Sequence, residues 1–136
     1  VVEGPEETAL FESVMADVSG APTYSLLRGA AYLKDNRLLP RGWREDHPGV
    51  ETIAPVGTKE DPDFGSGGDT ILYRFRAPRK RGPFRGSAEL VYQTLGSRYA
   101  AELFRSEAPE VAEFRTRWQT ADPRPASVAS AEASID

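Results

Sequence analysis

The sequence predicts a mainly β protein: a β-sandwich of six to eight strands, jelly-roll or immunoglobulin-like, with two helices inserted before the last strand. Segments that alternate apolar and polar side chains, rich in aromatic and β-branched residues, recur along the chain. Proline- and glycine-rich loops separate these segments. Outside an ambiguous N-terminal stretch, helical periodicity is confined to about residues 97–121.

The composition is that of a folded globular chain. Its 136 residues predict a single domain, and a start at Val1-Val2-Glu3 without Met or an apolar leader predicts a segment of a longer protein. Apolar runs of only a few residues argue against a membrane span. A net charge of −4 and a pI near 5.1 argue against nucleic-acid binding. The absence of cysteine excludes disulfides, thiolate metal sites and haem attachment.

Residues 6–18 fit two structures. Five apolar side chains at helical spacing favour a helix that begins after Pro5 and ends at Gly20: Leu10, Phe11, Val14, Met15 and Val18. As a strand, the segment would place Leu10, Val14, Ala16 and Val18 on one face, with Glu12 as a misfit. Periodicity alone favours the helix.

The next segments predict a strand and an ordered crossover. Residues 23–33 have strand composition, and Gly29 within them indicates a bulge or a close backbone approach. Residues 32–42 place charged and amide side chains against Leu38 and Leu39, then end in Pro40-Arg41-Gly42. We expect the leucines to anchor a loop to the core. Asp35, Asn36 and Arg37 would make local, structural hydrogen bonds, including an Asp35–Arg37 ion pair.

The rest of the chain predicts loops, a hairpin and helices. Residues 40–69 are loop-dominated, with a short strand only at 50–56. Residues 69–76 and 87–95 alternate and predict a long-looped antiparallel hairpin. A helix is expected from Ser97, its N-cap, and a second from 108 to 121 with Pro109 near its start. Residues 127–135 predict a closing or edge strand.

Several of these segments are similar to one known family. They resemble the non-haem domain that follows the haem-binding part in some bacterial multihaem c-type cytochrome proteins. The segments that carry the resemblance are residues 13–23, 26–28, 32–42, 63–64, 68–69, 90–93 and 114–122. The resemblance covers about residues 10–130. It implies a strand at 10–18, which we adopt over the helix, and a periplasmic or otherwise extracytoplasmic location. It implies no activity, and no haem ligation transfers to a chain without cysteine.

No catalytic set is visible in the sequence. His47 is the only histidine, lies in a polar loop that we expect to be exposed, and has no Gly-x-Ser-x-Gly motif to serve. A glycosidase-type pair of Asp35 with Glu45 or Asp46 is not favoured. We therefore expect no enzyme.

Residues 60–69 offer closely spaced carboxylates beside a glycine run. Calcium takes six to eight oxygen ligands, and Asp61, Asp63 and Asp69 are the candidates for such a site. The spacing does not match an EF-hand, and Asx-turn chemistry explains aspartate and glycine here equally well.

A basic arm and an aromatic residue are the candidates for partner binding. Cationic residues gather in an otherwise acidic chain and predict docking to an anionic partner: Arg74, Arg76, Arg79, Lys80, Arg81 and Arg85. Phe84 would be the anchor within the arm. Trp43 would either stack on a sugar or peptide, or close over a sheet edge, whereas Trp118 lies on a helix stripe and is expected in the core.

These features predict a non-catalytic accessory or interaction domain, and the resemblance implies that it belongs to an exported, multihaem cytochrome-type redox protein. It would dock another domain or subunit through its loops and the basic hairpin. The alternative is a carbohydrate-binding module, with Trp43 and loop tyrosines as platforms and a structural calcium ion at Asp61, Asp63 and Asp69.

Overall fold

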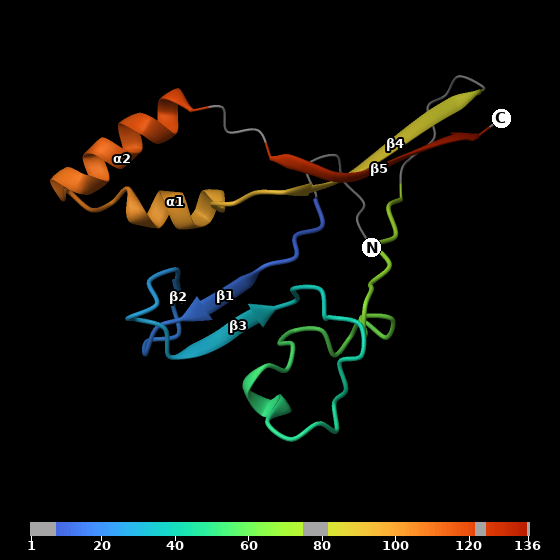
Figure 1. The fold of residues 1–136 in the computed structure, drawn as a ribbon, viewed down its shortest axis with the longest axis horizontal. Helices are drawn as coiled ribbons and strands as arrows, with labels where there is room; N and C mark the ends of the chain where they lie inside the picture. The colour runs from blue at the N-terminus through green and yellow to red at the C-terminus, as the bar shows by residue number, and fades with distance from the viewer. Residues whose placement is uncertain (1–7, 75–81, 122–124, 136) are drawn as a thin grey trace. The chain divides into compact units, whose positions relative to one another are not determined.

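The computed structural model describes residues 8–74, 82–121 and 125–135 and contains two antiparallel sheets and two α-helices (Figure 1). Both helices precede the last strand, as the sequence predicts. The chain divides into two compact units, Val1–Arg76 and Ala77–Asp136, and each sheet belongs to one of them. No helix in the described ranges is long and apolar enough to cross a membrane. The β-sandwich and the single domain both stay predictions.

The first unit is built on a three-stranded antiparallel sheet. Strand β1, Ser13–Ala16, lies between β2, Pro22–Thr23, and β3, Ala31–Asp35. Its burial alternates, with Val14 and Ala16 buried while Ser13 and Met15 are half-buried. This period of two is that of a strand, so the helix favoured by periodicity is wrong and the strand is correct.

The expected strand at residues 23–33 is interrupted by a turn. Arg28 N and Gly29 N both donate to Ser25 O, at 3.0 and 3.1 Å, and this turn carries the chain from β2 to β3 across β1. Gly29 is closely approached, but by a side chain and not by another strand's backbone: a Cβ there would lie 2.7 Å from Met15 Sδ. The bulge lies instead in β1, where the register with β3 shifts between Val14 and Met15.

The strand predicted at residues 50–56 is also wrong. The segment forms a short 3₁₀ helix, η1, at Val50–Thr52, entered through Gly49 at φ 83° and closed by a hydrogen bond from Ile53 N to Val50 O at 2.9 Å. Val56 makes only an isolated antiparallel bridge with Asp35. The rest of residues 40–69 is loop, as predicted.

The second unit pairs two strands that are far apart in the sequence. Strand β4, Phe84–Tyr92, runs antiparallel to β5, Ala126–Ile135, which confirms the closing strand. The hairpin predicted from residues 69–76 and 87–95 is not found: residues 69–74 form no strand, and residues 75–76 lie outside the described ranges. The prediction failed because it paired neighbouring segments, whereas both helices are inserted between the partners.

The two strands of the second sheet divide their side chains cleanly between two faces. From the register, one face is apolar: Phe84, Gly86, Ala88 and Leu90 of β4 with Ala129, Ala131 and Ala133 of β5. The other face is polar: Arg85, Ser87 and Glu89 with Ser130, Glu132 and Ser134. A register shift between Leu90 and Val91 ends this pattern toward the helices.

The helices agree closely with the sequence. Helix α1 spans Ser97–Leu103 and α2 spans Pro109–Thr120, with Pro109 in the first turn; the N-cap of α1 is Gly96 rather than Ser97. Phe114 contacts both Phe104 and Trp118, with ring centroids 6.0 and 6.3 Å apart. Trp118, expected in the core, is half-buried.

Few described side chains are fully buried. They are Val14, Ala16 and Thr23 in the first unit and Ala100 in the second. The tight packing of this fold is therefore limited to the small sheet and to one turn of α1.

Candidate functional site: the Trp43 loop and the aspartate cluster

The loop that follows β3 is held in successive turns. Trp43 N donates to Pro40 O at 3.1 Å, and Val50 N donates to His47 O at 3.1 Å. Ser66 fastens the loop from a distant segment: its hydroxyl accepts from Gly42 N at 2.7 Å and lies 3.3 Å from Pro40 O, to which it donates. The sequence shows the proline and glycines that make these turns but not the tie to Ser66.

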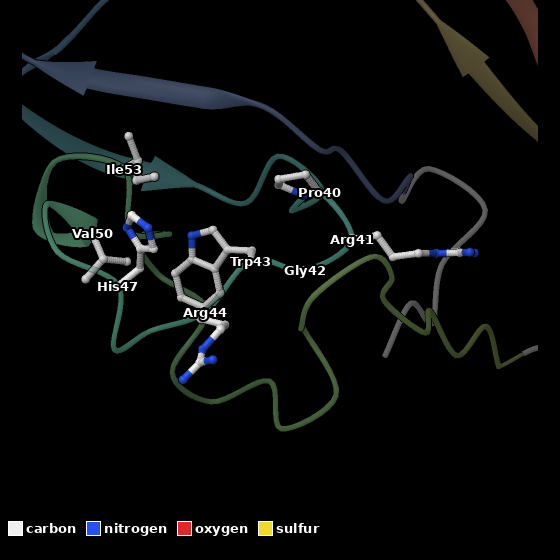
Figure 2. A pocket seen from close by; sticks show the side chains of 8 residues that line it. All are labelled: Pro40, Arg41, Gly42, Trp43, Arg44, His47, Val50 and Ile53. Atoms are coloured by element: carbon white, nitrogen blue, oxygen red, sulfur yellow. The ribbon is translucent and has the colours of Figure 1, made fainter.

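These turns line a cavity of about 230 Å³ that is partly open to solvent (Figure 2). We call residues 40–53 the Trp43 loop. The lining joins apolar side chains with cationic and imidazole groups: Pro40, Arg41, Gly42, Trp43, Arg44, His47, Val50 and Ile53. Trp43 is half-buried in the middle of this set, and its indole Nε1 is buried without a hydrogen-bond partner. Trp43 is thus part of a cavity wall and does not stand out as a free platform.

The charged groups of the cavity differ in how they are engaged. Arg44 pairs with Asp46 through two hydrogen bonds of 2.8 and 2.5 Å, and this contact raises the pKa of Arg44 and lowers that of Asp46. Arg41 is exposed, and its guanidinium contacts no acceptor in the described part of the chain. His47 is exposed, as predicted, with Nδ1 2.9 Å from Pro48 O. Arg41 and His47 therefore remain available to a ligand.

The structure gathers the three aspartates that the sequence nominated for calcium. One carboxylate oxygen of each of Asp61, Asp63 and Asp69 lies within 4.8 Å of the others. The pKa of Asp61 is raised, first because its protonated carboxyl donates a hydrogen bond to Asp63, and then by desolvation and the nearby negative charges. The pKa of Asp63 is lowered, first by a hydrogen bond from the Thr70 side chain and then by one from Asp61. An isolated bridge between Gly65 and Gly68 closes the glycine run beside the cluster.

The residues nominated as structural all make hydrogen bonds at the crossover. Arg37 binds Asp35 through two hydrogen bonds of 2.8 and 2.6 Å, as predicted. Asn36 reaches further than expected: its Oδ1 accepts from Glu12 N and its Nδ2 donates to Leu10 O, both at 3.0 Å. These bonds join the end of β3 to the segment that precedes β1. Leu38 remains 45% exposed, so it anchors the loop less than expected.

The predicted basic arm is only partly visible. Arg79, Lys80 and Arg81 lie outside the described residues. Phe84, half-buried, and Arg85, exposed, are the first residues of β4 in the second unit, whereas Trp43 belongs to the first.

Sequence reasoning missed a set of exposed aliphatic side chains on two turns. Val18 is 94% exposed in the turn between β1 and β2, and Leu26 and Leu27 are 83% and 99% exposed in the turn between β2 and β3. An ion pair between Arg28 and Asp17, 3.1 Å long, joins the two turns. The turn signal at residues 19–22 was present in the sequence, but the turn at residues 25–29 has no proline and only a terminal glycine.

Comparisons with known proteins found no match: no family model, no curated protein and no solved structure is significantly similar to this chain.

Proposed function

We propose that this chain is a non-catalytic interaction module that docks a partner through the Trp43 loop. The observation that carries the proposal is the placement of Trp43 in a cavity wall between apolar and cationic side chains. Tryptophan and arginine are the residue types that most often dominate binding energy at interfaces. Both types line this cavity.

The unpaired indole N–H suggests what the partner supplies. A buried donor without an acceptor costs about 1–3 kcal/mol, and Trp43 Nε1 is such a donor. A partner that shifts the loop and brings a carbonyl or carboxylate oxygen would remove this cost. Arg41 and His47 both line the cavity and favour an acidic partner, with the Arg41 side chain directed away from Trp43 and His47 beside the indole (Figure 2).

The wider context in this proposal is an accessory part of an exported, multihaem redox protein. Its support is the resemblance of residues 13–23, 26–28 and 32–42 to the non-haem domain of such proteins. Reading the coding sequence on both sides of this segment tests it. Cys-x-x-Cys-His motifs in the same frame would support the redox context, whereas a glycosidase domain there would favour the carbohydrate-binding alternative.

Fluorescence of Trp43 tests the docking itself. The Trp118→Phe variant leaves Trp43 as the only tryptophan. We expect a glutamate-rich peptide to change its emission, and we expect this response to weaken with added salt. In the same titration, Arg41→Glu should reduce the affinity, while Arg105→Glu, a charge change in the other unit, should leave it unchanged.

The same titration separates the alternatives. A response to cello-oligosaccharides but not to the acidic peptide would replace the docking proposal with carbohydrate binding. A response to neither, or an equal response in Arg41→Glu, would overturn the Trp43 loop as the docking site. For a true partner, Trp43→Ala should weaken binding about 30-fold, the effect of losing about 2 kcal/mol at an interface centre.

The alternative function, a carbohydrate-binding module with a structural calcium ion, is favoured by one observation: the three gathered aspartates. The pKa of Asp61 is raised mainly by its hydrogen bond to Asp63 and by desolvation, and the negative charges of Asp69 and Asp63 add to it; a divalent cation would relieve this crowding of carboxyl groups. For sugar stacking, however, Trp43 makes no ring contact with another aromatic side chain in the described ranges.

Calcium binding is directly measurable. We expect CaCl₂ to raise the midpoint temperature of thermal unfolding. At a calcium concentration one hundred times Kd, the free energy of unfolding should increase by about 2.7 kcal/mol. Asp63→Asn should abolish the increase, whereas Asp46→Asn, an aspartate outside the cluster, should retain it. An unfolding midpoint that does not respond to calcium at neutral pH would rule out this site.

A further inference from the structure

We infer that the chain self-associates through the outer edge of β5, which pairs with β5 of a second copy to form a four-stranded antiparallel sheet. This inference concerns the second unit and does not depend on the Trp43 loop. It begins from the sheet order: β4 and β5 form a two-stranded sheet, so each has one edge without a strand partner in the described residues.

Strand β5 is the less protected of the two edges. Its ten residues are small apart from Val128 and Ile135, include no proline and carry a single charge, at Glu132. No described residue pairs with its outer backbone groups. Strand β4 carries two charged residues, Arg85 and Glu89, and Pro83 directly precedes it. Charged residues and proline at an edge strand oppose pairing with a further strand.

The sheet itself has reason to add a strand. Two-stranded ribbons are marginally stable in water, and three or more strands with an apolar face are needed for independent stability. The apolar face here has Leu90 at 44% exposure and Ala88, Ala129, Ala131 and Ala133 exposed. A second copy would double the number of strands and make this face continuous.

The register between the two β5 strands is selected by two requirements: the apolar faces must lie on the same side, and like charges must not be opposite each other. Opposite residues in an antiparallel pair point to the same side, so the alanine faces join only when residues of equal parity meet. A two-fold axis at Ala131 sets Ala131 against Ala131 of the second copy and Ala129 against Ala133. It also sets Glu132 against Ser130 of the second copy. An axis at Glu132 would set two like charges directly opposite, which is unfavourable.

A second copy is the occupant that this pattern fits. Over residues 129–133 the strand complements itself on both faces, because Glu132 meets Ser130 and each alanine meets an alanine. The contact along one strand is small beside the roughly 800 Å² per partner of a standard interface, so the dimer belongs to the weak, concentration-dependent class.

The absence of cysteine from the chain allows a clean proximity test. Single-cysteine variants of the full chain are treated with a short bis-maleimide in the micromolar concentration range. Ala131→Cys is expected to give a covalent dimer, because the two thiols face each other across the axis. Ala112→Cys, an exposed alanine on α2, is the matched control and should remain monomeric.

Sedimentation velocity of two charge variants tests the register. Ala131→Lys sets two lysines opposite each other and is expected to abolish the dimer. Ser130→Lys, the neighbour on the other face, meets Glu132 of the second copy and should tighten association about fivefold. Circular dichroism confirms that both variants fold, and Ser130→Lys keeps the test decisive should Ala131→Lys unfold.

Three results would overturn the inference. The wild-type chain could stay monomeric at every concentration, Ala131→Lys could fold and still dimerise, or Ala112→Cys could cross-link as efficiently as Ala131→Cys.

Discussion

Asn36 replaces two backbone hydrogen bonds with its side chain. Its amide accepts from Glu12 N and donates to Leu10 O, while its own backbone N donates to Glu12 O at 3.2 Å. The side chain thereby continues the β1–β3 pairing before Ser13, the start of β1, where Asn36 N to Glu12 O is the one backbone hydrogen bond between the two described segments. The sequence nominated Asn36 as structural, but the partners lie about two dozen residues away and no local rule identifies them.

Removing this amide should loosen the start of β1. We expect Asn36→Ala to lower the free energy of unfolding by about 2 kcal/mol, since two backbone groups lose their partner. Urea denaturation measures the change. Gln119→Ala, an amide on the exposed side of α2, is the control and should be nearly neutral; equal effects of the two substitutions would contradict this role for Asn36.

The Asp35–Arg37 pair makes stability depend on pH. The hydrogen bond from Arg37 lowers the pKa of Asp35 below its ordinary value of 3.8. Because the folded pKa is depressed, the stabilisation is present above about pH 3.8 and is lost as the pH falls through the folded value. Asp35→Asn should thus lower the free energy of unfolding at pH 7 by about 1 kcal/mol; this value is small because Arg37 is exposed and solvent screens the pair. At low pH the substitution should have little effect.

An exposed pair of the same spacing provides the control. Arg44 and Asp46 are also two residues apart, but the Asp46 side chain is 68% exposed against 13% for Asp35. Asp46→Asn should cost less than Asp35→Asn at pH 7. If the two substitutions cost the same, burial of Asp35 does not set the strength of its pair.

At the scale of elements, the sequence predicted what is periodic and local. Helix α1 follows from the start signal at Ser97, and α2 from Pro109 at the helix start and from the helical stripe that carries Trp118. The closing strand follows from its alternation. Two errors share one cause: residues 23–33 and 50–56 have strand composition, yet hydrogen bonds within four residues turn the chain there. The predicted hairpin failed for another reason, because the partner of β4 lies beyond both helices. The cavity around Trp43 was equally invisible, because Ser66 closes its loop from elsewhere in the sequence.

Gly29 tests how tightly the β2–β3 turn lies on β1. A Cβ at this position would come within 2.7 Å of Met15 Sδ, so the methionine would have to move. We expect Gly29→Ala to lower the free energy of unfolding by about 1 kcal/mol and Met15→Ala to remove this sensitivity. Gly86→Ala on β4, where the added Cβ meets nothing within 4 Å, is the control and should not destabilise.

At the scale of the whole molecule, the single-domain prediction requires the two units to unfold together. Each contains one tryptophan, Trp43 in the first and Trp118 in the second. The single-domain prediction expects both to report the same urea midpoint, because domains of about 60 residues bury too little surface to be robust alone. Fluorescence of Trp43→Phe and Trp118→Phe measures the two transitions separately. Distinct midpoints would make residues 1–76 and 77–136 separate domains.

The pairing of β4 with β5 also orders the events of folding. Met15 and Thr23 are joined by a single turn, whereas Tyr92 and Ala126 are separated by both helices, and Phe84 and Ile135 lie further apart still. Each doubling of a loop adds about 0.6 kcal/mol to the entropy of closing it. The small sheet can therefore nucleate early, and the ribbon must wait for α1 and α2 to shorten the distance between its strands. Pairing of β4 with β5 would then begin at Tyr92 and Ala126, next to the helices, and proceed toward Phe84. The two helices together would connect the strands as a turn connects a hairpin.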